Sequence, residues 1–157
     1  MMSKFPTIHC LNTILEESFK ERSKTSGNSS LENTDRKNPS IYSNWITIKN
    51  LTVARTILAS LGDDDKKNIL NAVLDKPRTF MEIMEITKLP SSSGYRKVCS
   101  LLDNGLLIEL NSNINSGGKR KIKYKSIFQN IEINIEKNKI IIKILLTKEA
   151  LGKYIEV

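Results

Sequence analysis

Residues 89–107, LPSSSGYRKVCSLLDNGLL, are the stretch that decides the fold. At 100° per residue, small and apolar side chains fall on one side of a helix and polar side chains fall on the other. The inward set is Gly94, Val98, Leu101 and Leu102, and the outward set is Ser92, Ser93, Arg96, Ser100 and Asn104. Ser91 after Pro90 is suited to cap the helix start, and Gly105 is suited to end it. The stretch therefore predicts an amphipathic helix with a polar outer face.

Two more helices are predicted upstream of this one. Thr79 and Glu82 have the spacing of a capping box at the start of a short apolar run. Pro90 disfavours helical backbone at the residue before it, so the chain must turn sharply between the two helices. Further upstream, the acidic run 63–65 suits a helix N-terminus. The inward stripe of that first helix is Ile69, Leu70, Val73 and Leu74.

The segment after the helices carries most of the excess charge. Residues 111–127 hold five basic and no acidic side chains in a chain of net charge +8. A turn-forming run, 111–118, precedes an alternating stretch in which Lys121, Lys123 and Lys125 share one strand face. With residues 106–110 as partner strand, this pattern predicts a β-hairpin with a flexible basic tip, which suits a polyanion. The alternative is a solvated edge strand that its lysines protect from aggregation.

Residues 63–127, about two-fifths of the chain, resemble the winged helix-turn-helix of ArsR-type and related bacterial and archaeal transcription regulators. The matching residues are Leu61–Asp63 leading into Lys67–Leu70, Leu89–Ser91 with Tyr95 and Arg96, Leu101–Leu107, and the basic hairpin. The resemblance implies a DNA-binding regulator, usually a homodimer, with the second helix of the motif in the major groove. The wing would lie against the flanking backbone or in the minor groove. The Leu-Leu-x-x-Gly-Leu ending identifies the architecture better than the subfamily.

In this interpretation the reading helix and the wing divide the contacts with double-stranded DNA between them. Contacts with bases and phosphates are expected from Ser91, Ser92, Ser93, Tyr95 and Arg96, with Lys97 reaching a phosphate from the side. Contacts with the flanking backbone or the minor groove are expected from Lys119, Arg120, Lys121 and Lys123.

Other chemistries find little support in the sequence. Metal-sensing members of the resembled family carry paired cysteines, whereas Cys10 and Cys99 lie far apart, so we expect no metal and no cofactor. Cys99 is interpreted as a small core residue. The only histidine, His9, lacks a recognisable catalytic constellation, and no phosphate-binding loop is present, so we expect no enzyme. The N-terminus does not have the pattern of a signal peptide, and the apolar run 140–146 is too short to span a bilayer. We therefore expect no membrane partner and a cytoplasmic, nucleoid-associated location.

The remaining segments are accessory. Residues 1–22 are predicted to hold an amphipathic helix from about Thr7 to Arg22, and residues 23–40 a disordered polar linker. The helical stripe from Val53 to Leu61 either forms a dimer interface or enlarges the core. Alternating isoleucines on either side of Lys137–Asn138 predict a second hairpin over 131–146, which either covers the core or pairs with a second copy. Residues 147–157 form a tail or short helix.

The predicted fold class is α+β. We expect a winged helix-turn-helix over residues 41–146, made of a three-helix core and a β-hairpin wing, with an additional C-terminal β-hairpin and an N-terminal extension. The predicted function is a homodimeric, DNA-binding transcriptional regulator. Two alternatives use the same architecture: a protein-interaction module within a transcription or regulatory assembly, and an RNA-binding winged helix.

Overall fold

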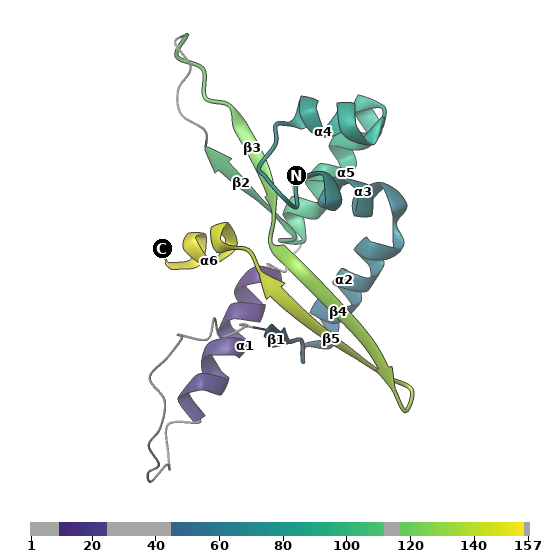
Figure 1. Cartoon of the computed structure of the whole chain (residues 1–157), viewed down its shortest axis with the longest axis vertical. Coiled ribbons are helices and arrows are strands. Elements are labelled where there is room, and N and C mark those ends of the chain that lie inside the picture. The colour runs from purple at the N-terminus through teal and green to yellow at the C-terminus, as the bar shows by residue number, and fades with distance from the viewer. Residues whose placement is uncertain (1–9, 25–44, 112–116, 156–157) are drawn as a thin grey trace, which may run out of the picture.

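The computed structural model describes residues 10–24, 45–111 and 117–155, and it is α+β, as predicted. Within these ranges the chain forms six helices and two small antiparallel sheets (Figure 1). The helices are α1 (Cys10–Lys24), α2 (Leu51–Gly62), α3 (Asp64–Ala72), α4 (Phe80–Thr87), α5 (Ser91–Asp103) and α6 (Lys148–Ile155). The strands are β1 (Trp45–Thr47), β2 (Leu107–Asn111), β3 (Ile122–Ser126), β4 (Phe128–Glu136) and β5 (Lys139–Leu146).

Local signals set the ends of α3, α4 and α5. The side chain of Asp63 accepts a hydrogen bond from the Lys66 amide at 3.1 Å and so caps α3. The predicted capping box of Thr79 and Glu82 is present at the start of α4. After α5 the chain turns at Gly105, whose φ of 72° is the left-handed conformation that glycine adopts without strain.

The expectation that Ser91 caps α5 is wrong. Pro90 occupies the capping position, with φ −59° and ψ 137°, and no side chain caps this helix. A capping side chain belongs to the residue just before the first helical turn, whereas Ser91 is already the first residue of the helix. The hydroxyl of Ser91 is thus not committed to the helix start.

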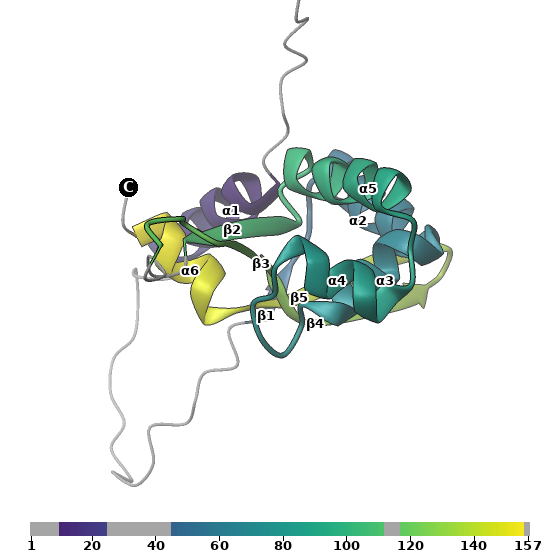
Figure 2. The same cartoon turned by 90° about the horizontal axis from the view of Figure 1, so that it is seen from above.

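The hairpin of β2 and β3 follows α5 and is joined to the helices at a second point. Its strands pair from Leu107 opposite Ser126 to Asn111 opposite Ile122, one residue later than predicted for β2. Arg78, just before α4, pairs with Tyr124: each backbone amide donates to the other residue's carbonyl, at 3.1 and 2.7 Å. Figure 2 shows α3, α4 and α5 grouped on one side and β2 extending away from them. The pairing of Arg78 with Tyr124 therefore fixes the orientation of the hairpin relative to the helices.

The second sheet has the strand order β1-β5-β4. The predicted hairpin over 131–146 is confirmed: β4 and β5 are antiparallel, and both Lys137 and Asn138 have positive φ, 48° and 64°. This is the conformation of a two-residue turn whose twist matches that of the strands. Val53 and Ile57 of α2 are fully buried in the core. The stripe on α2 therefore enlarges the core of this chain, which was one of its two expected uses.

The two terminal helices pack on this core. Cys10, Ile14 and Leu15 of α1 are buried, and so is Ala150 of α6. Burial raises the pKa of the Cys10 thiol, which is consistent with an unreactive core residue. Helix α1 ends two residues later than predicted, at Lys24. The predicted start of this helix at residues 7–9 and the predicted linker from residue 25 to 40 lie outside the described residues. Of the two forms expected for residues 147–157, a tail or a short helix, the structure has the helix, α6.

Candidate nucleic-acid interface

Helix α5 is held by its inner face, which leaves its outer face on the surface. Gly94, Val98 and Leu101 are buried. A Cβ atom on Gly94 would overlap the Sδ and Cε atoms of Met84, so glycine at this position allows α5 to approach α4 closely. Leu102, which was predicted to face inward with these residues, is only partly buried. The amphipathic interpretation of this helix thus holds for its central turns.

The outer face presents several of the predicted contact residues together. Ser91, Ser92, Tyr95 and Arg96 are exposed, and Ser93 is half-buried. The ring of Tyr95 packs edge-to-face against that of Phe80, with centroids 6.0 Å apart. A hydrogen bond with the Cys99 side chain raises the pKa of the Tyr95 phenol. The face therefore offers hydroxyl groups and one guanidinium group, which are suited to base edges and phosphate oxygens.

Lys97 is differently placed from the residues around it. Its ammonium group forms an ion pair and hydrogen bond with the carboxylate of Asp63, the residue that caps α3. This pair lowers the pKa of Asp63 and raises that of Lys97. Because the partner lies 34 residues away, the sequence pattern gave no sign of it. Lys97, expected to reach a phosphate, fastens α5 to the start of α3.

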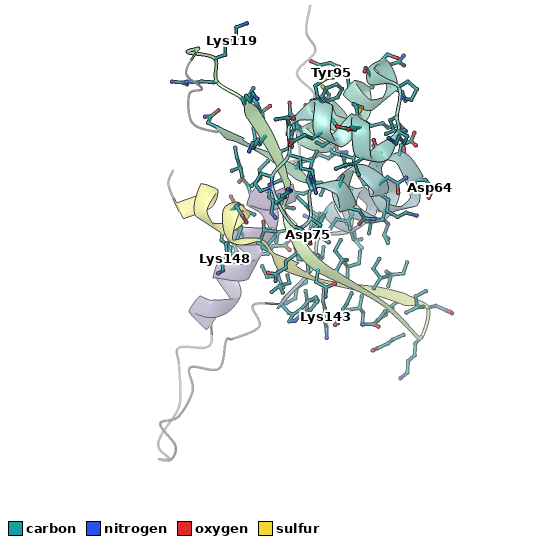
Figure 3. All side chains as sticks on the ribbon, turned by 45° about the horizontal axis from the view of Figure 1, so that its top comes forward. Asp64, Asp75, Tyr95, Lys119, Lys143 and Lys148 are labelled. Atoms are coloured by element: carbon teal, nitrogen blue, oxygen red, sulfur yellow. The ribbon has the colours of Figure 1, made fainter. Side chains whose placement is uncertain are left out.

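The exposure of the basic residues in the β2–β3 hairpin decreases from its tip to its base. Lys119, Arg120 and Lys121 are exposed, and Lys123 is half-buried with its charge acting on Glu82 of α4. Figure 3 shows Lys119 at the far end of the hairpin, on the same end of the molecule as Tyr95. Residues 112–116 of the predicted tip lie outside the described residues. Three of the four predicted wing contacts are therefore fully on the surface.

Lys125 shares the alternation of Lys121 and Lys123 but has a structural role. Its side chain is only 4% exposed, and its ammonium donates to the Leu74 carbonyl oxygen at 2.6 Å. Arg78 donates from Nε to the Ala72 carbonyl oxygen at 2.7 Å, so two cations lie at the carboxyl end of α3. Cations at this end of a helix offset the negative end of its dipole and bind its free carbonyl groups. The alternation alone gave no indication of this change of role.

Negative charge is also present beside this surface. Glu82 and Glu85 of α4 are exposed, and hydrogen bonds from the Thr79 backbone and hydroxyl lower the pKa of Glu82. Exposed positive charge beside these carboxylates includes Arg96 on α5, Lys88 in the turn before it, and the basic residues of the β2–β3 hairpin. Among the described residues no group of three His, Cys, Asp or Glu side chains could hold a metal ion. In the same residues, no helix combines the length and apolarity needed to cross a bilayer.

No protein-family model, curated protein or solved structure matches the chain. The surface formed by α5 and the β2–β3 hairpin is the feature of this chain that bears most directly on its function.

Proposed function

We propose that this protein is a DNA-binding transcriptional regulator with a winged helix-turn-helix, similar to the ArsR-type regulators. The supporting order of elements is α3, the isolated β-bridge at Arg78, α4, α5 and then the β2–β3 hairpin, which corresponds to the wing. Helix α5 would enter the major groove, and the wing would lie on the flanking backbone or in the minor groove. Double-stranded DNA is the proposed partner.

One observation carries the proposal: the exposed polar face of α5 and the basic end of the wing lie at the same end of the molecule (Figure 3). The helix supplies Arg96 and the serine hydroxyls for base edges, while Lys119, Arg120 and Lys121 supply positive charge for phosphates. This division matches the general pattern in which phosphate contacts position a protein and base contacts specify the sequence.

The test is a fluorescence-anisotropy titration of the full chain with random duplex DNA at several salt concentrations. The test variant is Lys119→Ala/Arg120→Ala/Lys121→Ala. The control variant, Arg55→Ala/Lys139→Ala/Lys148→Ala, removes the same amount of charge from exposed residues outside the wing. We expect log K to fall steeply with log salt for the parent, and the slope to flatten by about three units in the wing variant alone.

A second candidate function is a winged-helix protein-interaction module. Met81 and Ile86 of α4 are exposed apolar residues, at 71% and 48%, and they lie beside the acidic residues of the same helix. Exposed apolar side chains of this kind suit a protein partner better than a phosphate backbone. If the parent does not bind DNA even at low salt, the DNA proposal fails and this module becomes the better explanation. Duplex RNA, used as a competitor, separates DNA from RNA binding.

A further inference from the structure

The β4–β5 hairpin carries a ladder of isoleucines on one face. Three cross-strand pairs form this ladder: Ile131 opposite Ile144, Ile133 opposite Ile142, and Ile135 opposite Ile140. The other face pairs Glu132 with Lys143 and Glu136 with Lys139, so its charges balance. The other face also carries Ile141, opposite Asn134, and the isoleucine ladder itself contains no charged group.

Burial along this ladder changes sharply from base to tip. Ile144 and Ile142 are 0% and 1% exposed, whereas Ile133, Ile140 and Ile135 are 43%, 53% and 73% exposed. The base of the hairpin lies on the core, and the tip extends beyond it toward the lower right of Figure 1. Three large apolar side chains on one continuous face are more than scattered surface residues require, and such a face indicates an interface.

The backbone of β4 is also available for pairing. Within the described sheet β4 is an edge strand, because only β5 pairs with it. It is nine residues long and contains neither proline nor lysine, the residues that most often protect an edge from pairing. A long edge strand with an apolar face is a template for another strand.

A hollow lies at the base of the same face. A pocket of about 190 Å³ opens between the α2–α3 region and the start of β4, lined by apolar side chains and a few amides. Its apolar lining is Leu61, Leu70, Leu74, Phe128 and Ile131. Ile131 thus belongs both to the pocket and to the isoleucine ladder. Along β4, Ile131 at the pocket and the protruding Ile135 are about 13 Å apart, at 3.3 Å per residue. One strand therefore carries an apolar hollow at one end and an exposed isoleucine at the other.

We infer that this face binds a second copy of the chain, with β4 pairing antiparallel to the partner's β4 about a two-fold axis at Ile133. This arrangement places Ile135 of each copy opposite the partner's Ile131, at the edge of the partner's pocket. A two-fold interface is self-complementary in this way: each copy supplies the protrusion and the hollow. The absence of charge on this face argues against nucleic acid as its occupant. The inference does not depend on the proposed DNA binding.

Charge supports the register. With the axis at Ile133, Glu132 lies opposite the partner's Asn134, and no two glutamates face each other. An axis at Asn134 would set Glu132 opposite the partner's Glu136, and an axis at Glu132 would set two copies of that residue together. Like charges directly opposite destabilise a strand pair. A register shifted by one residue would place the isoleucines of one strand opposite the polar residues of the other strand.

The first experiment measures the mass of the full chain by light scattering or sedimentation equilibrium, without nucleic acid. We expect twice the 17.8 kDa of one chain for the parent. Ile135→Lys should raise the dimer dissociation constant by at least about 100-fold, because the pairing would bury an unpaired charge. Ile122→Lys, on β3, makes the same substitution at an isoleucine that is 43% exposed and lies outside β4, and it should leave the dimer intact. Circular dichroism and urea unfolding check that both variants remain folded.

The second experiment tests the register in a Cys99→Ser background. Differently tagged Ile131→Cys and Ile135→Cys proteins are mixed and oxidised mildly, and we expect the mixed disulfide in excess over either self-linked product. Ile133→Cys should link to itself. A monomeric parent, a dimer that Ile135→Lys leaves unchanged, or a missing mixed disulfide would each overturn the inference. Because the mass is measured without DNA, a failure to bind DNA would leave this result standing.

Discussion

The chain has two hairpins that extend from opposite ends of the molecule, and they carry opposite kinds of side chain (Figure 1). The described part of the β2–β3 hairpin exposes Lys119, Arg120 and Lys121 before β3, whereas the β4–β5 hairpin exposes Ile133, Ile135 and Ile140 on one face, next to its polar turn. Both alternate along their strands, and both have bases that pack on the same core. Alternation of side chains along the strands therefore predicts a hairpin in both cases, whereas the side chains that each hairpin exposes indicate which kind of partner it can bind. We expect a polyanion at one end and a second copy of the chain at the other.

The largest expected effect separates the base of the isoleucine ladder from its tip. Ile144→Ala removes a fully buried side chain and should lower the free energy of unfolding by about 2–5 kcal/mol. Ile135→Ala removes a side chain that is 73% exposed in one chain, and in dilute monomer it should change this free energy by less than about 0.5 kcal/mol. Urea unfolding at low protein concentration measures both. Equal losses would mean that the tip is covered within a single chain.

The second effect concerns α5, the proposed reading helix. Arg96→Ala should weaken specific binding by about 1–3 kcal/mol and relax the preference at one base position, because arginine pairs with guanine through two hydrogen bonds. The measurement is anisotropy on a panel of duplexes, once a preferred site has been selected from random DNA. Arg55→Ala, on α2, removes an exposed arginine from a helix outside the proposed interface and is the control. A uniform loss over all duplexes would show that Arg96 contacts phosphate instead.

Short-range signals account for the parts of the fold that the sequence predicted well. The capping box at Thr79 and Glu82, the left-handed Gly105 and the Lys137–Asn138 turn each act within a few residues, and each is present. The same holds for the exposed face of α5, which follows from helical periodicity. These features fix where elements begin and end without information from the rest of the chain.

Apart from Ser91 at the start of α5, two lysines were misplaced because their partners lie far along the chain. Lys97 pairs with Asp63, 34 residues earlier, and Lys125 binds the Leu74 carbonyl, 51 residues earlier. Both are lysines in basic stretches, and the pattern alone does not distinguish a cation aimed at solvent from one aimed at a helix end. The exposure of the hairpin tip was equally inaccessible, because it depends on how far α2 and α3 extend along β4 and β5.

Asp63→Ala has a smaller effect, which tests whether Lys97 belongs to the fold instead of the reading surface. The variant loses the α3 cap, and we expect a loss of about 1 kcal/mol in the free energy of unfolding at neutral pH. Asp63 has a lowered pKa in the folded chain, so the stabilisation requires its ionised form.

The effect of Asp63 should therefore depend on pH. It is fully present above the ordinary pKa of 3.8 and is lost as the pH falls through the lowered folded value. The difference between parent and variant should shrink in acid, which urea unfolding from pH 7 to pH 2 would record. Asp64→Ala is the control, because Asp64 makes only an exposed pair with Lys67, at 2.8 Å. A difference that stays constant with pH would contradict the stabilising role given to the ionised Asp63 carboxylate, which caps α3 and pairs with Lys97.

The smallest effect compares single lysines at the two hairpin ends. Lys119→Ala should flatten the slope of log K against log salt by about one unit. Each phosphate contact releases about one counterion on binding, and the variant makes one contact fewer. Lys139→Ala removes the same charge from the β4–β5 hairpin, where Lys139 lies opposite Glu136, and should leave the slope unchanged. Anisotropy with random duplex DNA measures both variants. If the two slopes fell equally, binding would depend on net charge alone, and the contrast between the two hairpins would no longer identify the wing as the site of DNA contact.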